Sequence, residues 1–184
     1  MDALELLLSR SSNAKLVHPA PSGKALSNIL DAALRAPDHA NLSPYRFIVC
    51  EGPGLQPLAD IYTHAAKTSQ MDQAVIEKSQ KMPFRAPMVV VAICKYTEHE
   101  KVPRVEQIAT TACAVQNMQM AAQAQGFNGM WRTGSFATNQ AVRDAFDLKE
   151  MDEIVGFLYL GTPDGETPIK RQKKQEPYVE YWRE

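Results

Sequence analysis

The stretch from Gln107 to Trp131 contains no charged side chain. Its length alone is sufficient for a helix to cross a membrane. Besides Gln107 at its start, six amide side chains lie within it, and each would need a hydrogen-bond partner inside hydrocarbon. They are Gln116, Asn117, Gln119, Gln123, Gln125 and Asn128. We therefore expect no membrane contact and predict a long helix that is buried in a protein core or in a subunit interface.

Length, charge and cysteine content limit the class of protein. The chain has 184 residues, which fits one domain spanning residues 1–184. Its 20 Lys and Arg balance 21 Asp and Glu, so it lacks the basic excess of a nucleic-acid-binding protein. Three cysteines, all expected in the core, cannot form a closed disulfide framework, and no basic secretion signal precedes the first apolar residues. These features favour a cytoplasmic protein with a small-molecule or protein partner.

Hydrophobic periodicity predicts helices that alternate irregularly with strands. Apolar residues recur with helical spacing from Leu26 to Leu34, and Pro37 is expected to end that helix. Further helices are expected over residues 2–9, 55–68, 72–81, 104–126 and 139–148, and strands over 45–50, 88–94, 129–132 and 153–160. This irregular order predicts an α+β layer fold.

Several common site motifs are missing from the sequence. No Gly-x-Gly-x-x-Gly follows a predicted strand, which argues against a Rossmann dinucleotide site, and no phosphate-binding Gly-x-x-x-x-Gly-Lys-Ser/Thr occurs. No Gly-x-Ser-x-Gly nucleophile elbow occurs either. The four histidines are far apart and form no metal pair with each other or with a cysteine. Hydrolases and metal enzymes are therefore disfavoured, and no metal site is expected.

A compact group of cations and hydroxyls follows the first predicted helix. It consists of Arg10, Ser11, Ser12 and Lys15. Arginine offers a fork of donors and lysine a compact charge, so the group suits a phosphate monoester. The alternative interpretation is a solvated turn in which a serine caps the chain.

A second candidate group lies in the segment 35–47. A loop bounded by two prolines joins a helix to a strand there and can hold Arg35, His39 and Asn41 in fixed positions. The alternative is that the segment serves only to pack a helix against a strand.

Two later segments are also candidates. The glycine-rich segment 126–134 lets backbone approach a ligand closely, and it offers the flat face of Trp131 and the hydroxyl of Thr133. A tight turn with Trp131 in the core is the alternative. The basic run 170–174 is either a solvated face or a segment that closes over a phosphate.

In this order, these segments resemble the nitroreductase family of FMN-dependent oxidoreductases, in particular its small, compact branch. The resemblance rests on Arg-x-Ser at 10–12, on Arg-Ala-Pro-x-x-x-Asn-x-x-Pro-Tyr-x-Phe at 35–47 and on Gly-Phe-x-Gly-x-Trp-Arg-Thr-Gly at 126–134. The segment 155–163 closes the match, which covers roughly residues 2–163. Where the family often has a second and a later Arg near the N-terminus, this chain has Ser11 and Lys15.

The resemblance implies a three-layer α+β fold, in which helices flank a central, mostly antiparallel sheet. It also implies an intertwined homodimer with two FMN sites between the subunits, one group of ligands coming from the partner chain. The implied ligands are Arg10, Ser11, Ser12 and Lys15 at the phosphate and ribityl chain, Arg35 and His39 on the same cofactor, Trp131, Arg132 and Thr133 beside the flavin, and Ala121, Ala122, Gln123, Ala124, Gln125 and Gly126 near the nicotinamide nucleotide.

The reaction implied by the resemblance is a ping-pong exchange. NAD(P)H gives a hydride to flavin N5 and leaves, and a nitroaromatic or quinone-type acceptor then takes electrons in the same place. Because the flavin carries the chemistry, no catalytic side chain is assigned. Two other hypotheses remain at this point: the same fold with dehalogenation, dehydrogenation or flavin breakdown as its chemistry, and a non-catalytic flavin-binding dimer.

Overall fold

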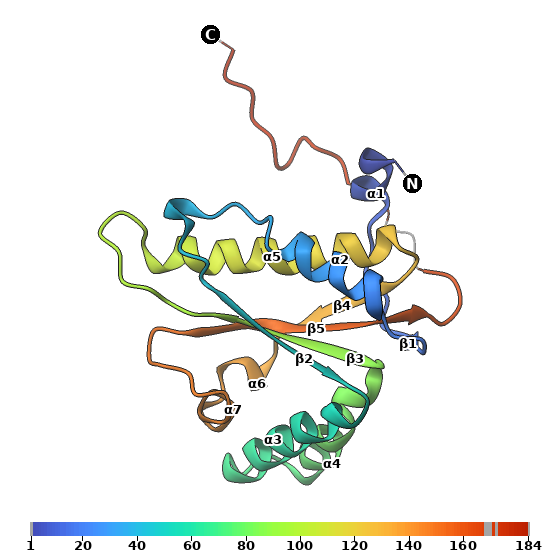
Figure 1. The fold of residues 1–184 in the computed structure, drawn as a ribbon, viewed down its shortest axis with the longest axis vertical. Helices are drawn as coiled ribbons and strands as arrows, with labels where there is room; N and C mark the ends of the chain where they lie inside the picture. The colour runs from blue at the N-terminus through green and yellow to red at the C-terminus, as the bar shows by residue number, and fades with distance from the viewer. Residues whose placement is uncertain (1, 168–170, 172, 184) are drawn as a thin grey trace.

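A five-stranded sheet crosses the centre of the described chain, which comprises residues 2–167, 171 and 173–183 of a computed structural model (Figure 1). The fully buried β3 (Met88–Cys94) lies between β2 (Tyr45–Glu51) and β5 (Glu153–Pro163). β5 also pairs with β4 (Asn128–Arg132) and with β1 (Leu16–Val17). Each of these pairings is antiparallel, which confirms the predicted type of sheet.

One face of the sheet is covered by α5 (Arg104–Ala124) and α2 (Gly23–Ala33) (Figure 1). Apolar side chains from these helices and from β3 and β5 form a common core there. The amides of the uncharged helix bind its neighbour, because Asn117 donates to the carbonyl of Ala32 at 3.1 Å and Asn28 donates to Gln125 at 2.9 Å. These contacts set α2 antiparallel to α5, and they confirm the predicted buried helix.

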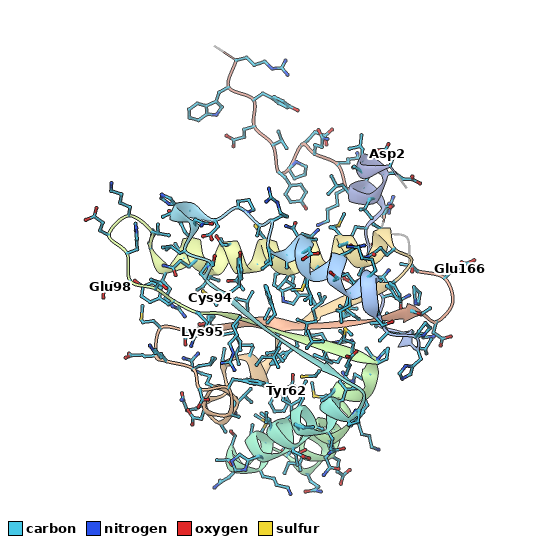
Figure 2. All side chains as sticks on the ribbon, viewed as in Figure 1. Asp2, Tyr62, Cys94, Lys95, Glu98 and Glu166 are labelled. Atoms are coloured by element: carbon cyan, nitrogen blue, oxygen red, sulfur yellow. The ribbon has the colours of Figure 1, made fainter. Side chains whose placement is uncertain are left out.

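The other face of the sheet carries a second layer of helices. They are α3 (Leu55–Thr68), α4 (Gln73–Lys81), α6 (Ser135–Thr138) and α7 (Gln140–Ala145). Tyr62 lies between α3 and the sheet (Figure 2), where it stacks on Phe136 at 4.6 Å and meets Phe157 edge-on at 5.3 Å. Because aromatic pairs with these geometries pack efficiently, they join the helices firmly to β5. The three layers implied by the resemblance are therefore present.

Short elements complete the described chain. They are α1 (Ala3–Ser9) and the 3₁₀ turns η1 (His39–Asn41), η2 (Gly52–Gly54) and η3 (Pro83–Arg85). α1 lies beyond the C-terminal end of α5, and residues 173–183 extend away from the layers on the same side (Figure 1). Among the described residues, no helix combines the length and the apolar character needed to cross a membrane.

Some predicted boundaries differ from the observed ones. α2 ends at Ala33, earlier than Pro37 had suggested. The backbone N–H groups of Arg35 and Ala36 each donate to the carbonyl three residues earlier, which closes a tighter turn than an α-helix. α5 ends at Ala124 in a Schellman motif, where Gly126 has φ +86° and the N–H of Phe127 donates to the carbonyl of Ala122 at 3.0 Å. The predicted C-terminal glycine therefore caps the helix from outside it.

The cysteines do not share one environment. Cys50 and Cys94 are buried, and burial raises the pKa of each thiol above its ordinary value. Cys113 is exposed on α5, so the prediction that all three pack in the core was wrong for this residue. Its position on an uncharged helix had suggested burial, but it lies on the face that turns away from the sheet.

Candidate functional site

Residues 10–15 connect α1 to β1 and form the first part of the candidate site. The side chain of Ser11 is buried, those of Arg10 and Ser12 are half-buried, and Lys15 is exposed. Arg10 Nη1 lies 3.5 Å from Ser12 Oγ. The structure thus keeps the predicted cations and hydroxyls within one short segment.

Hydrogen bonds from β4 and α5 hold this segment in place. The backbone N–H of Asn13 donates to the carbonyl of Gly129 on β4 at 3.2 Å. The side-chain amide of Gln119 on α5 donates to the same carbonyl at 3.0 Å and to Ser12 Oγ at 3.3 Å. The segment therefore lies against the start of β4 and the C-terminal half of α5.

The second part of the site is the end of β4. Trp131 Nε1 donates to the carbonyl of Val155 at 3.2 Å, and Thr133 is exposed. The guanidinium carbon of Arg132 lies 5.7 Å from the centre of the Tyr159 ring. In the described part of the chain, the buried Nε of Arg132 has no hydrogen-bond acceptor. A strand advances about 3.3 Å per residue, so roughly 10 Å of β4 separates Arg132 from the carbonyl that holds the N-terminal segment.

Residues 121–126 form the last turn of α5 and the cap that follows it. Ala122 packs in the core, and Gln125 donates to the carbonyl of Ala25 at 3.3 Å, so these two side chains hold α2 and the sheet. Gln123 differs, because its buried Oε1 finds no donor among the described residues. Gln123 lies one helical turn beyond Gln119, whose amide holds the N-terminal segment.

Arg35 and His39 follow α2 toward the opposite end of α5. His39 Nδ1 lies 2.8 Å from Glu106 Oε2, in the first turn of α5. Thirteen residues of helix separate Glu106 from Gln119, a distance of about 20 Å. Arg35 is exposed and has no hydrogen bond to the N-terminal segment within the described residues. A single chain thus leaves His39 far from the other predicted ligands.

The C-terminal tail leaves the core beside the N-terminal segment. Thr167 Oγ1 accepts hydrogen bonds of 3.4 Å from the amides of Asn13 and Asn128. In the predicted basic run 170–174, Lys170 lies outside the described residues, and the other basic side chains are exposed.

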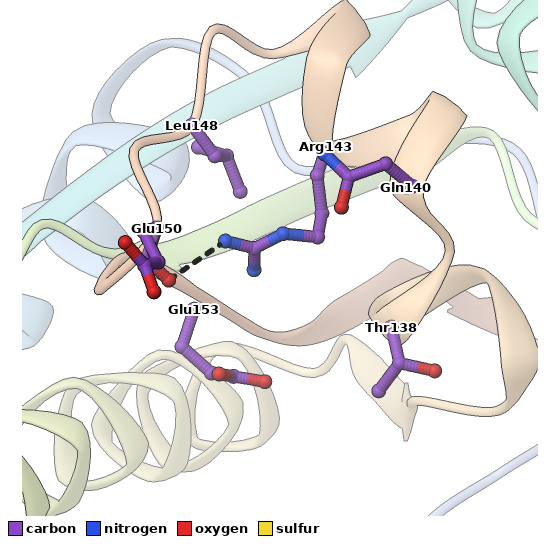
Figure 3. A pocket seen from close by; sticks show the side chains of 6 residues that line it. All are labelled: Thr138, Gln140, Arg143, Leu148, Glu150 and Glu153. Atoms are coloured by element: carbon purple, nitrogen blue, oxygen red, sulfur yellow. Dashed lines mark hydrogen bonds between the residues drawn. The ribbon is translucent and has the colours of Figure 1, made fainter.

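A separate cavity of about 490 Å³ lies near the start of β5 (Figure 3). It is lined by Thr138, Gln140, Arg143, Leu148, Glu150 and Glu153. Arg143 is engaged by backbone carbonyls, including that of Glu150 at 3.1 Å, and Glu153 pairs with Arg104. None of the predicted site residues lines this cavity among the described residues, and Arg143 and Glu153 already hold the α7–β5 connection and the start of α5 respectively.

Reasoning from the sequence missed three residues that shape the site. Gln119 bonds the N-terminal segment, Glu106 pairs with His39, and Gly156 lies against Trp131. The only signal for Gln119 was its place among the amides of an otherwise apolar helix, since a buried amide needs partners. The other two contacts depend on how distant segments pack.

Comparisons with known proteins agree with this arrangement. Residues 7–162 match the sequence profile of the nitroreductase family. The chain belongs to this family. It is 48% identical over 163 residues to YdjA of Escherichia coli K12, a protein provisionally named NAD(P)H nitroreductase, and the match covers 89% of each chain. The nitroreductases are oxidoreductases, so the chain is an enzyme of that class.

Solved nitroreductases share the fold at much lower identity. A nitroreductase-like protein of Bacillus cereus superimposes with a TM-score of 0.85 at 21% identity, covering 99% of this chain and 96% of the other. A nitroreductase of Bacteroides fragilis, solved with bound FMN, gives 0.75 at 19% identity and covers all of both chains. These likenesses confirm the nitroreductase fold.

The residues of the site fit an FMN. The segment 10–15 offers two cations and two hydroxyls to a phosphate, and phosphates favour such donors. Among the described residues, the buried Nε of Arg132 on β4 has no acceptor, and the buried Oε1 of Gln123 on α5 has no donor. Buried polar atoms are normally paired, so both atoms indicate that a further group belongs beside them.

Proposed function

We propose that this chain is an FMN-dependent oxidoreductase that uses NAD(P)H to reduce a nitroaromatic or quinone-type acceptor by a ping-pong reaction, with residues 1–184 acting as one flavin-binding domain. Its family membership and its relatives' names support the reaction class. The observation that carries the proposal is the segment 10–15, whose cations and hydroxyls are held beside β4 by Gln119 and by the backbone of Asn13. We infer a cytoplasmic location, in keeping with three cysteines that are free thiols.

The N-terminal segment binds the phosphate end of the cofactor in this proposal. Arg10 and Lys15 supply positive charge, and Ser11 and Ser12 supply hydroxyl donors. Charge-assisted hydrogen bonds to phosphate are short and strong, so this segment contributes much of the affinity for FMN over riboflavin.

Trp131, Arg132 and Thr133 border the ring system of the cofactor. When bound, FMN supplies the atom that accepts and returns the hydride. The guanidinium of Arg132 stabilises negative charge beside the ring, and its fixed position over Tyr159 means that little reorganisation is needed during the reaction. Residues 121–126 border the approach of the nicotinamide nucleotide, where Gln123 Oε1 offers an acceptor that no described residue bonds.

Arg35 and His39 contact the cofactor from a second copy of the chain. The distance along α5 supports this part of the proposal, since about 20 Å of helix separates Glu106, the partner of His39, from the N-terminal segment. Exposed apolar side chains on α1, Leu4, Leu7 and Leu8, give the surface that a homodimer needs to bury.

The visible spectrum of the purified protein tests the proposal first. We expect a flavin spectrum that bleaches when NADH or NADPH is added without oxygen and that returns when a nitroaromatic is added. A bound flavin that neither nucleotide reduces would indicate other flavin chemistry, and a flavin that is reduced but passes electrons to no acceptor would indicate a non-catalytic protein. Either result, or a protein that binds no flavin, contradicts the proposed reaction.

A further inference from the structure

We propose that Gln119 is the positioning residue that makes the site selective for a phosphorylated flavin, by fixing the direction in which Ser12 donates its hydroxyl proton. This inference rests on the proposed function, because it concerns the phosphate end of the same site. It assigns a role to a buried amide of α5 that sequence motifs do not mark.

The orientation of the Gln119 amide follows from its partners. The carbonyl of Gly129 can only accept, so the Nε2 end of the amide must face it at 3.0 Å. The second hydrogen of the same nitrogen is directed at Ser12 Oγ, 3.3 Å away. Both donors of the amide are therefore used, and the side chain, which is 2% exposed, cannot turn over without losing them.

The lone pairs of Ser12 are occupied as a result. A serine hydroxyl has two lone pairs and one proton. Gln119 Nε2 donates to one lone pair, and Arg10 Nη1 donates to the other from 3.5 Å. Since both incoming groups are donors, the proton of Ser12 points away from them. Ser12 is thereby set as a donor, which is the role that a phosphate oxygen requires.

The same amide also sets where Ser12 lies. Gly129 accepts from Gln119 and from the backbone of Asn13, so one carbonyl of β4 holds both α5 and the N-terminal segment. No side chain fits at position 129, because a Cβ there would lie 2.9 Å from the carbonyl oxygen of Tyr159. Replacing the donors of Gln119 therefore frees Ser12 to rotate and loosens the segment that carries Arg10.

Titrations with FMN and riboflavin test the inference, because only FMN carries the phosphate. For apoprotein with Gln119→Met, which keeps the length of the side chain and removes its donors, we expect the Kd for FMN to rise about ten- to hundred-fold. The Kd for riboflavin should change by less than about three-fold, because its ring contacts at β4 are left in place. Gln119→Glu gives a second variant of similar size. Its carboxylate should accept the Ser12 proton, and this should also raise the ratio of the Kd for FMN to the Kd for riboflavin.

Two further variants complete the design. If Gln119 acts through Ser12, adding Gln119→Met to Ser12→Ala should weaken FMN binding much less than it does in the wild-type chain. Asn117→Leu is the matched control, since this amide on the same helix bonds a carbonyl of α2 and should leave the ratio of the two Kd values unchanged. A wild-type protein that binds neither flavin would defeat the proposed function. Wild-type selectivity for FMN that persists in both Gln119 variants would overturn only this inference.

Discussion

The indole of Trp131 occupies a space on β5 that exists because residue 156 is glycine. A Cβ at Gly156 would lie 2.1 Å from Trp131 Nε1 and 2.9 Å from the carbonyl oxygen of Arg132. The pairing of β3 with β5 is irregular at this point, and the carbonyl of Val155 receives the indole N–H. Because Gly156 has no side chain, Trp131 can pack against β5, and this contact holds the end of β4 that borders the proposed flavin site.

We predict that Gly156→Ala displaces Trp131 and destabilises the protein by about 1–3 kcal/mol, the usual cost of overpacking. Urea unfolding measures the stability, and Trp131 fluorescence in a Trp182→Phe background reports the indole environment. Gly54→Ala is the control, since Gly54 has open space around it and an α-region backbone. Unchanged stability and emission in Gly156→Ala would show that the space above Gly156 does not hold the indole of Trp131.

For single residues, the sequence predicts which side chains lie close together along the chain, but it does not predict the long-range hydrogen bonds that hold them. Arg10 and Ser12 were identifiable because cations and hydroxyls adjoin in the chain. Gln119, by contrast, reaches Ser12 across 107 positions. No local pattern marks such a bond, because it depends on how α5 crosses the start of β4.

At the scale of elements, the turn before β5 is held by one buried carboxylate. Asp152 accepts hydrogen bonds from the backbone N–H groups of Tyr96 and Lys149 at 2.9 Å each and from the Lys95 ammonium. Burial by itself raises the pKa of Asp152, but the hydrogen bonds from Lys95, Lys149 and Tyr96 outweigh it and hold that pKa below its usual value. The carboxylate thereby joins the end of β3 to the start of β5.

Asp152→Asn should lower the free energy of unfolding at pH 7 by about 2–4 kcal/mol, because it leaves Lys95 and buried N–H groups poorly paired. Since the folded-state pKa of Asp152 is depressed, its contribution is complete above the unfolded pKa near 4 and is lost as the pH falls through the folded value. The difference in unfolding free energy between the two proteins should therefore shrink progressively as the pH falls below about 4. A difference that is the same at pH 7 and at pH 3 would contradict this assignment.

Periodicity predicted most elements closely, because each long helix or strand buries one face. The helix 55–68 and the strand 88–94 have the predicted bounds. β1 was not predicted, because a strand of two residues gives no sequence pattern and is defined by its pairing with β5. The predicted end of α2 was too late, because Pro37 prevents the helix from continuing but does not prevent it from ending earlier.

At the scale of the whole molecule, one chain supplies two separated halves of the proposed site. The N-terminal segment and the end of β4 lie together, whereas His39 is held by Glu106 near the start of α5. The sequence alone predicted both groups of ligands. The resemblance already implied that one group comes from the partner chain. The fold adds how far apart the two groups lie in one chain, and this distance makes sharing of each site between two copies the central claim.

Complementation between two inactive variants tests that claim most directly. One chain carries Arg10→Ala and Ser12→Ala, and the other carries Arg35→Ala and His39→Ala; each homodimer should bind FMN poorly and have little NAD(P)H-dependent activity. In a mixed dimer, one of the two shared sites is assembled entirely from unaltered residues, so the purified mixed dimer should recover FMN binding and about half of the wild-type activity. Activity of the mixed dimer that merely equals the mean of the two variants would contradict a site built from two chains.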